Sequence, residues 1–154
     1  MKLFKSNNEI IKANCTGKEI CFQGANIHQS VAWKVHTWML EQVTHAYDNN
    51  IEVGCLLPRD GWPIPPYPKH LDEEDLGVLK WRKTAKILHE KNDRTRNTRI
   101  ANAKIIWVAR RFQEEEEIFF PTSMDFRGRF YYRPPYLNPQ GNDVSRSLLL
   151  FANA

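Results

Sequence analysis

Apolar residues recur at the spacing of one helical face from about residue 26 to residue 47. Repeats of three and four positions place side chains on one side of an α-helix, because the helix has about 3.6 residues per turn. We therefore predict a long amphipathic helix that ends at Asn49 and Asn50. Its apolar face consists of Ile27, Val31, Val35, Trp38 and Ala46, with Met39 and Val43 beside them.

Prolines dominate the segment that follows. Five of the nine prolines lie between residues 57 and 70. Proline fixes the backbone φ angle and has no N–H to donate, so such a stretch favours extended, polyproline-like backbone over helix. Residues 57–70 are predicted to be a connector.

Two further helices are predicted after the connector. Asp72 is placed to cap the first, which runs to about His89, and Asp93 is placed to cap the second, which runs to about Glu116. The second helix carries two apolar stripes, which predicts contacts on two sides. One stripe consists of Ile100, Ala103 and Trp107, and the other of Ile105, Ala109 and Phe112.

Short aromatic segments characterise the last third of the chain. Residues 118–121 and 126–132 favour strands, which predicts a β-hairpin. Residues 138–142 are a turn by composition, and Asp143 is placed to cap a last helix that includes Val144, Leu148 and Phe151. We expect a mainly α protein with a short β-hairpin near the C-terminus, an α+β arrangement. Because the chain stops at or just after this helix, truncation is suspected.

Composition narrows the class of protein. A chain of 154 residues with 42% hydrophobic residues is long enough for one domain with its own core. No apolar run approaches the roughly 18 to 20 residues that a membrane span needs. Cys15, Cys21 and Cys55 are odd in number and lack C-x-x-C spacing, which argues against a zinc site and a disulfide framework. We expect a soluble protein in a reducing intracellular compartment.

Charge is distributed unevenly. The net charge is only +4, yet between Lys80 and Arg99 eight cations stand against two acids, a local +6. Cations along a helix can follow a phosphate backbone without reading base sequence. A solvated helix face is the alternative reading of the same cluster.

Residues 124–131 hold the closest grouping of side chains that could bind a ligand. If this segment is extended, the two-residue period of a strand gathers charge on one face and aromatic groups on the other. Two arginines two positions apart suit bidentate contacts to phosphates, and glycine allows a backbone to come close. A hairpin with a structural Asp–Arg pair is the alternative. The charged face would hold Asp125, Arg127, Arg129 and Tyr131, and the other face Phe126, Gly128 and Phe130.

Asp125, Gly128 and Arg129 resemble the D-x-x-G-R motif of the single-subunit RNA polymerases of phages, mitochondria and chloroplasts. Residues 119–121 match the aromatic-Pro step that precedes this motif. Residues 138–143, followed by Arg146, are similar to the next block of the family in its phage form.

Upstream, Gln29 and residues 32–35 resemble the Q-x-x-x-W-K signature of the same family, and the three matches agree in order and approximate spacing. Residues before about Ile20 match no part of it. Two positions depart from the pattern: His36 stands where many members have Asn, and Phe126 where phage enzymes often have Trp.

The resemblance implies a right-hand polymerase fold that transcribes a DNA template into RNA from ribonucleoside triphosphates. Residues 20–117 would be a helical thumb-like region and residues 118–154 the start of the palm, with residues 1–19 unplaced. This piece would grip template strand and RNA:DNA hybrid. The residues expected to contact nucleic acid are Trp33, Lys34, Arg96, Arg99, Asp125, Arg127, Gly128, Arg129, Tyr131, Gln140, Gly141 and Arg146.

The family's two metal-binding aspartates, and its fingers Lys and Tyr, lie downstream of the last matching block. Mg²⁺ is therefore expected in the complete polymerase and not on this chain, with no metal role for Asp125 or Asp143 and no catalytic residue here. The chain alone is expected to be inactive, and a split gene would have a second chain supplying palm and fingers. The alternatives are a stand-alone nucleic-acid-binding module and a helical scaffold without such a role. The resemblance places it in the cytoplasm of an infected bacterium rather than in an organelle.

Overall fold

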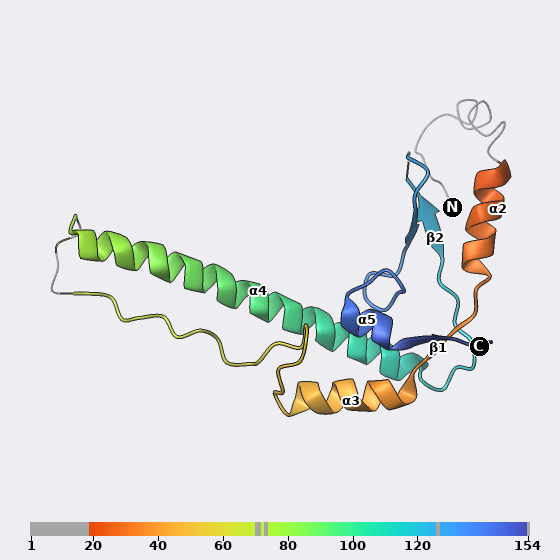
Figure 1. Ribbon diagram of the computed structural model, residues 1–154, viewed down its shortest axis with the longest axis horizontal. Coiled ribbons are helices and arrows are strands. Elements are labelled where there is room, and N and C mark those ends of the chain that lie inside the picture. The colour runs from red at the N-terminus through yellow and green to blue at the C-terminus, as the bar shows by residue number, and fades with distance from the viewer. Residues whose placement is uncertain (1–18, 70–71, 73, 126, 154) are drawn as a thin grey trace.

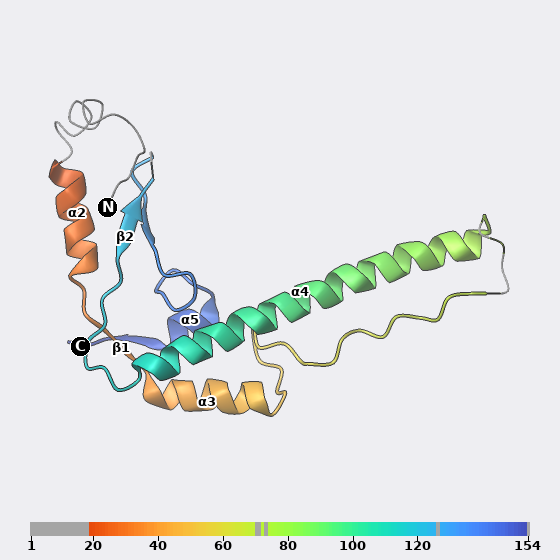
Figure 2. The same ribbon diagram turned by 180° about the vertical axis from the view of Figure 1, so that it is seen from behind.

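The computed structural model describes residues 19–69, 72, 74–125 and 127–153. Its outline is an L (Figures 1 and 2). The long arm consists of α4 and the proline-rich connector, the short arm of α2 and the β2–β3 hairpin, and α3, α5, β1 and β4 lie where the arms meet. In chain order the elements are α2 (Glu19–Gln29), β1 (Trp33–Val35), α3 (Thr37–Asp48), α4 (Leu76–Phe112), β2 (Thr122–Met124), β3 (Phe130–Tyr132), α5 (Asp143–Ser147) and β4 (Leu149–Phe151).

The predicted α+β class with a hairpin is confirmed, because helices predominate beside two small antiparallel sheets in the described part of the chain. None of the helices among those residues combines the length and apolar character needed to cross a membrane.

Strand β1 corrects the single helix predicted across residues 26–47. This strand separates α2 from α3 and pairs antiparallel with β4, Trp33 opposite Phe151 and Val35 opposite Leu149. The rings of Trp33 and Phe151 lie 4.4 Å apart between centroids. Aromatic and β-branched residues suit such cross-strand pairs, and this distant partner outweighs the local helical period.

Helix α4 corrects the two helices predicted after the connector. It runs unbroken for 37 residues, about 55 Å at 1.5 Å per residue, and Asp93 lies inside it. Its N-cap is Asp75 rather than Asp72, and the Asp75 carboxylate accepts a hydrogen bond from the Gly77 N–H at 2.6 Å. Aspartate inside a helix costs only a few tenths of a kcal/mol, and no glycine or proline follows Gly77 within α4 to break it.

The described residues of the predicted connector, 57–69, form neither helix nor strand. The connector runs beside the first half of α4 (Figures 1 and 2). The Asn92 side chain accepts from the Trp62 N–H at 2.6 Å and donates to the Trp62 carbonyl at 2.9 Å. The Trp81 indole N–H donates to the Pro65 carbonyl at 2.8 Å. These bonds satisfy backbone groups that an extended segment would otherwise leave to water.

Helix α5 is shorter than predicted and is capped by a different residue. Asn142 accepts a hydrogen bond from the Ser145 N–H at 2.9 Å, so Asn142 and not Asp143 is the N-cap. The helix ends at Ser147, and the chain continues into β4, which contains Phe151. The prediction that Phe151 belongs to the last helix is wrong because pairing with β1 determines the backbone there.

The hydrophobic core lies where the arms meet. The second half of α4 contributes Ile105 and Ala109 of one predicted stripe, whose third member, Phe112, is 40% exposed and does not belong to the core. The other stripe is not packed, since Ile100 and Trp107 are 46% and 64% exposed. The full core consists of Val35, Leu40, Val43, Leu56, Ile105, Ile106, Ala109, Phe120, Leu137, Val144, Leu148 and Leu149.

Candidate nucleic-acid interface

Asp125 and residues 127–129 connect β2 to β3, and we call this segment the turn 125–129. The Asp125 Oδ1 atom accepts hydrogen bonds from the backbone N–H groups of Arg127 and Arg129, both at 2.9 Å. The Gly128 N–H donates to the Asp125 carbonyl at 3.1 Å. Gly128 has a φ of 80°, a conformation that residues with a Cβ rarely adopt. The predicted extended face across residues 125–131 is therefore wrong, because the aspartate nucleates a local turn.

The turn presents polar groups to solvent. Arg127, Gly128 and Arg129 are exposed, and no atom lies within 4 Å of a Cβ built on Gly128. The Tyr131 hydroxyl donates to Asp125 Oδ2 at 3.4 Å. The aspartate thus orders the loop through backbone N–H groups, and the two arginines are exposed at the hairpin tip. Phe126 lies outside the described residues.

Aromatic residues of β3 pack against neighbouring elements. The Phe130 ring lies 5.2 Å from the His28 ring of α2, and Tyr132 meets Phe120 edge-to-face at 5.9 Å. Burial raises the pKa of the Tyr132 phenol, because an apolar environment disfavours the phenolate. Tyr131, between them, is 44% exposed. Of these three rings, Tyr131 is the most available for stacking on a base.

Gln140 ties the loop that follows to the hairpin. Its side-chain oxygen accepts from the Tyr132 N–H at 3.1 Å, and its side-chain nitrogen donates to the Phe130 carbonyl at 3.0 Å. The side chain therefore pairs with the free edge of β3 as a peptide group would. This geometry gives Gln140 a structural role in positioning the loop.

Gly141 precedes α5, and Arg146 lies within it. A Cβ on Gly141 would lie 2.6 Å from the Ser145 Cβ, so only glycine fits. Arg146 forms an ion pair with Asp143, and both side chains are exposed. The guanidinium is therefore at the surface beside a carboxylate of its own helix.

Trp33 and Lys34 lie in β1. The Trp33 ring is enclosed by Phe151 and Phe120, and its indole N–H is buried without a hydrogen-bond partner among the described residues. Lys34 Nζ donates to the Ala152 carbonyl at 3.4 Å. Trp33 packs into the structure, whereas the Lys34 ammonium lies at its edge.

Arg96 and Arg99 line a groove along α4, which we call the α4 groove. Its volume is about 790 Å³. The Arg99 guanidinium donates to the Leu57 carbonyl at 2.6 Å and lies 4.7 Å from the Tyr47 ring centre, whereas Arg96 is exposed. The groove is lined by Tyr47, Arg59, Gly61, Asn92, Thr95, Arg96, Arg99, Ile100, Ala103, Lys104 and Trp107.

The structure therefore does not bring the predicted site residues together in one place, since they lie on the hairpin, on β1, around the start of α5 and on α4. Gln140 joins its loop to the hairpin, while Arg96 and Arg99 belong to the long arm (Figure 1). Sequence reasoning missed Tyr47 and Arg59, whose place in the groove depends on the path of the connector. The part of the groove formed by α4 has a signal in the sequence, because its residues repeat at the spacing of one helical face. These residues are Arg96, Ile100, Ala103 and Trp107. In the described part of the chain, no group of three or more His, Cys, Asp or Glu side chains is placed to hold a metal ion.

Comparison with known proteins identifies relatives of the chain. No protein-family model matches the sequence. It is 32% identical over 150 residues to DNA-directed RNA polymerase 2, chloroplastic/mitochondrial, of Arabidopsis thaliana, covering 96% of this chain and 14% of that protein. It is 30% identical over 132 residues to the DNA-directed RNA polymerase of Enterobacteria phage T3, covering 85% of this chain and 15% of that protein. The chain thus spans about one seventh of the length of these relatives.

Proposed function

Because this chain is homologous over most of its length to the single-subunit DNA-directed RNA polymerases, we propose that it serves in transcription of DNA into RNA and contributes a surface that holds nucleic acid. The nucleic acid is the template strand and the RNA:DNA hybrid, and the substrates of the complete enzyme are ribonucleoside triphosphates. Relatives occur in both phages and organelles, and we place this chain in the cytoplasm of an infected bacterium.

The turn 125–129 is the observation that carries this proposal. The Asp125 carboxylate orders its backbone, and Arg127 and Arg129 are exposed at its tip. Guanidinium groups bind phosphate oxygens through paired N–H donors, and an ordered turn lowers the entropy cost of that contact. Phosphate contacts position a nucleic acid without reading its sequence, as a transcribing enzyme requires.

We assign nucleotide addition, and the Mg²⁺ that supports it, to residues outside this chain. The Asp125 carboxylate already accepts two backbone N–H groups and the Tyr131 hydroxyl, and Asp143 pairs with Arg146. Both carboxylates therefore have partners within the protein, which supports this assignment. A second chain or segment would supply the catalytic aspartates, so this chain alone is expected to be inactive.

Binding of a short fluorescent RNA:DNA hybrid across salt concentrations tests the role of the turn. Each phosphate contact contributes roughly 0.9 to the slope of log affinity against log salt concentration. The double variant Arg127→Ala plus Arg129→Ala should bind more weakly and lower that slope by about two.

The matched control is Arg110→Ala plus Arg111→Ala, which removes the same charge at the end of α4, away from the hairpin. This control should keep most of the affinity. Equal losses of affinity in the two double variants would show that only net charge matters. Undetectable binding of the unaltered chain at low salt would contradict the proposed role in holding nucleic acid.

A further inference from the structure

The α4 groove has a lining suited to an anion with a flat apolar part. Its cations are Arg59, Arg96, Arg99 and Lys104, and no Asp or Glu is among the lining residues. Tyr47 and Trp107 add aromatic rings to the same groove. Cations interleaved with aromatic side chains are the features by which proteins hold nucleic-acid strands.

Most of these cations are engaged within the protein. Arg99 donates to the Leu57 carbonyl, Arg59 donates to the Asp48 carbonyl at 3.2 Å, and Lys104 Nζ lies 5.2 Å from the Tyr136 ring centre. Arg96 is exposed and has no side-chain partner among the described residues. Arg96 is therefore the cation best placed to meet a phosphate without breaking an internal contact.

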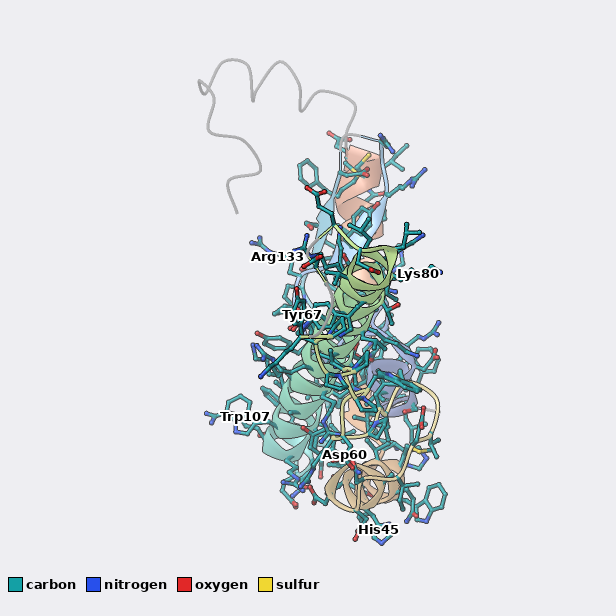
Figure 3. The ribbon with its side chains drawn as sticks, turned by 90° about the vertical axis from the view of Figure 1, so that its left-hand side faces the viewer. His45, Asp60, Tyr67, Lys80, Trp107 and Arg133 are labelled. Carbon is teal, nitrogen blue, oxygen red and sulfur yellow. The ribbon has the colours of Figure 1, made fainter. Side chains whose placement is uncertain are left out.

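Trp107 is the exposed ring of the groove. It is 64% exposed, and Figure 3 shows it projecting outward from α4. Arg96, Ile100 and Trp107 follow one face of the helix, and eleven residues at 1.5 Å give a row of about 16 Å. At a rise of roughly 3.4 Å per stacked nucleotide, that row corresponds to about five nucleotides.

We propose that the α4 groove binds single-stranded nucleic acid, with a base stacked on Trp107 and a phosphate held by Arg96. An unpaired strand is required because stacking between neighbouring base pairs covers the base faces inside a duplex, whereas a base of a single strand can turn its face to the Trp107 ring. The inference rests on the proposed function for the chemical class of the ligand. It adds a second surface and a different form of nucleic acid from the hybrid assigned to the turn 125–129.

Anisotropy of a short, unstructured, fluorescent oligoribonucleotide tests the proposal on the full chain. Loss of one stacked base predicts binding about five- to a hundredfold weaker for Trp107→Ala, with the salt slope unchanged. Arg96→Ala should instead lower the salt slope by about 0.7, the contribution of one phosphate contact to a single strand. Trp38→Ala is the control, since Trp38 is 59% exposed on α3 and lies outside the groove, and it should bind as the unaltered chain does.

Equal affinities of the Trp107→Ala and Trp38→Ala variants, or no binding of the oligoribonucleotide at low salt, would overturn the proposal. Measuring the affinity for the RNA:DNA hybrid and for the single strand with Trp107→Ala and with Arg127→Ala plus Arg129→Ala separates the two surfaces. If single-strand binding depends on Trp107 while hybrid binding ignores Arg127 and Arg129, the role of the turn fails and the groove stands. If hybrid binding depends on those arginines while Trp107→Ala leaves single-strand binding intact, the groove fails and the turn stands.

Discussion

Asp125 illustrates what individual residues do in this protein. Its carboxylate closes the turn by accepting two backbone N–H groups, and Gly128 supplies the positive φ that the turn needs. The sequence showed that these residues belong together, because Asp, Gly and Arg stood in a recognisable motif. It did not show their conformation, because an alternating pattern is equally compatible with a strand and with a short Asx turn.

Asp125→Ala should destabilise the chain by about 1–3 kcal/mol, because the turn loses an acceptor for two backbone N–H groups. Asp125→Asn keeps a side-chain oxygen that can accept at least one of these bonds and should lose less. Urea denaturation followed by circular dichroism measures both values. Identical midpoints for the Ala and Asn variants would show that the acceptor oxygen does not hold the turn.

At the scale of elements, the long arm was predicted in part. Five clustered prolines were sufficient to predict the connector, since proline excludes regular helix by its own covalent structure. The unbroken α4 was not predicted, because Asp93 has the composition of a cap and its actual position mid-helix depends on the helix continuing on both sides. The bonds between Asn92 and Trp62, 30 positions apart, have no local signature.

Asn92→Ala should release the middle of the connector from α4, because both hydrogen bonds to the Trp62 backbone disappear. Limited proteolysis and hydrogen exchange should then show faster cleavage and exchange in residues 57–69, by about five- to tenfold for a loss of roughly 1–1.4 kcal/mol. Asn97→Ala is the control, since Asn97 is an exposed asparagine of the same helix. Equal rates in the two variants would contradict a clamping role for Asn92.

At the scale of the whole molecule, a buried asparagine joins separate parts of the chain. Asn102 is fully buried, donates to the Cys55 carbonyl at 2.8 Å and accepts from the Asn142 side chain at 2.9 Å. It therefore links the segment just before the connector, α4 and the cap of α5. The α+β class followed from local sequence, but this link did not, because its members lie about 40 positions apart.

A double-mutant cycle on Asn102→Ala and Asn142→Ala should give a coupling energy of about 0.5–3 kcal/mol, as expected for residues that share a buried bond. The variants Asn92→Ala and Asn142→Ala serve as the comparison, since these side chains have no common partner, and their effects should add within about 0.5 kcal/mol. Chemical denaturation supplies the free energies of unfolding. Additive effects for Asn102 and Asn142 would mean that the link carries no energy of its own.

The pairing of β1 with β4 also sets an order of events during synthesis. Lys34 and Ala152, which meet beside this sheet, are 118 positions apart, so closing such a loop costs about 4 kcal/mol of chain entropy. Strand β1 leaves the ribosome long before its partner is made, and during that interval its backbone groups that pair with β4 lack those partners. Contacts of such long sequence separation form slowly. Assembly of the region where the arms meet is therefore a late step, completed only after residues 149–151 have been translated.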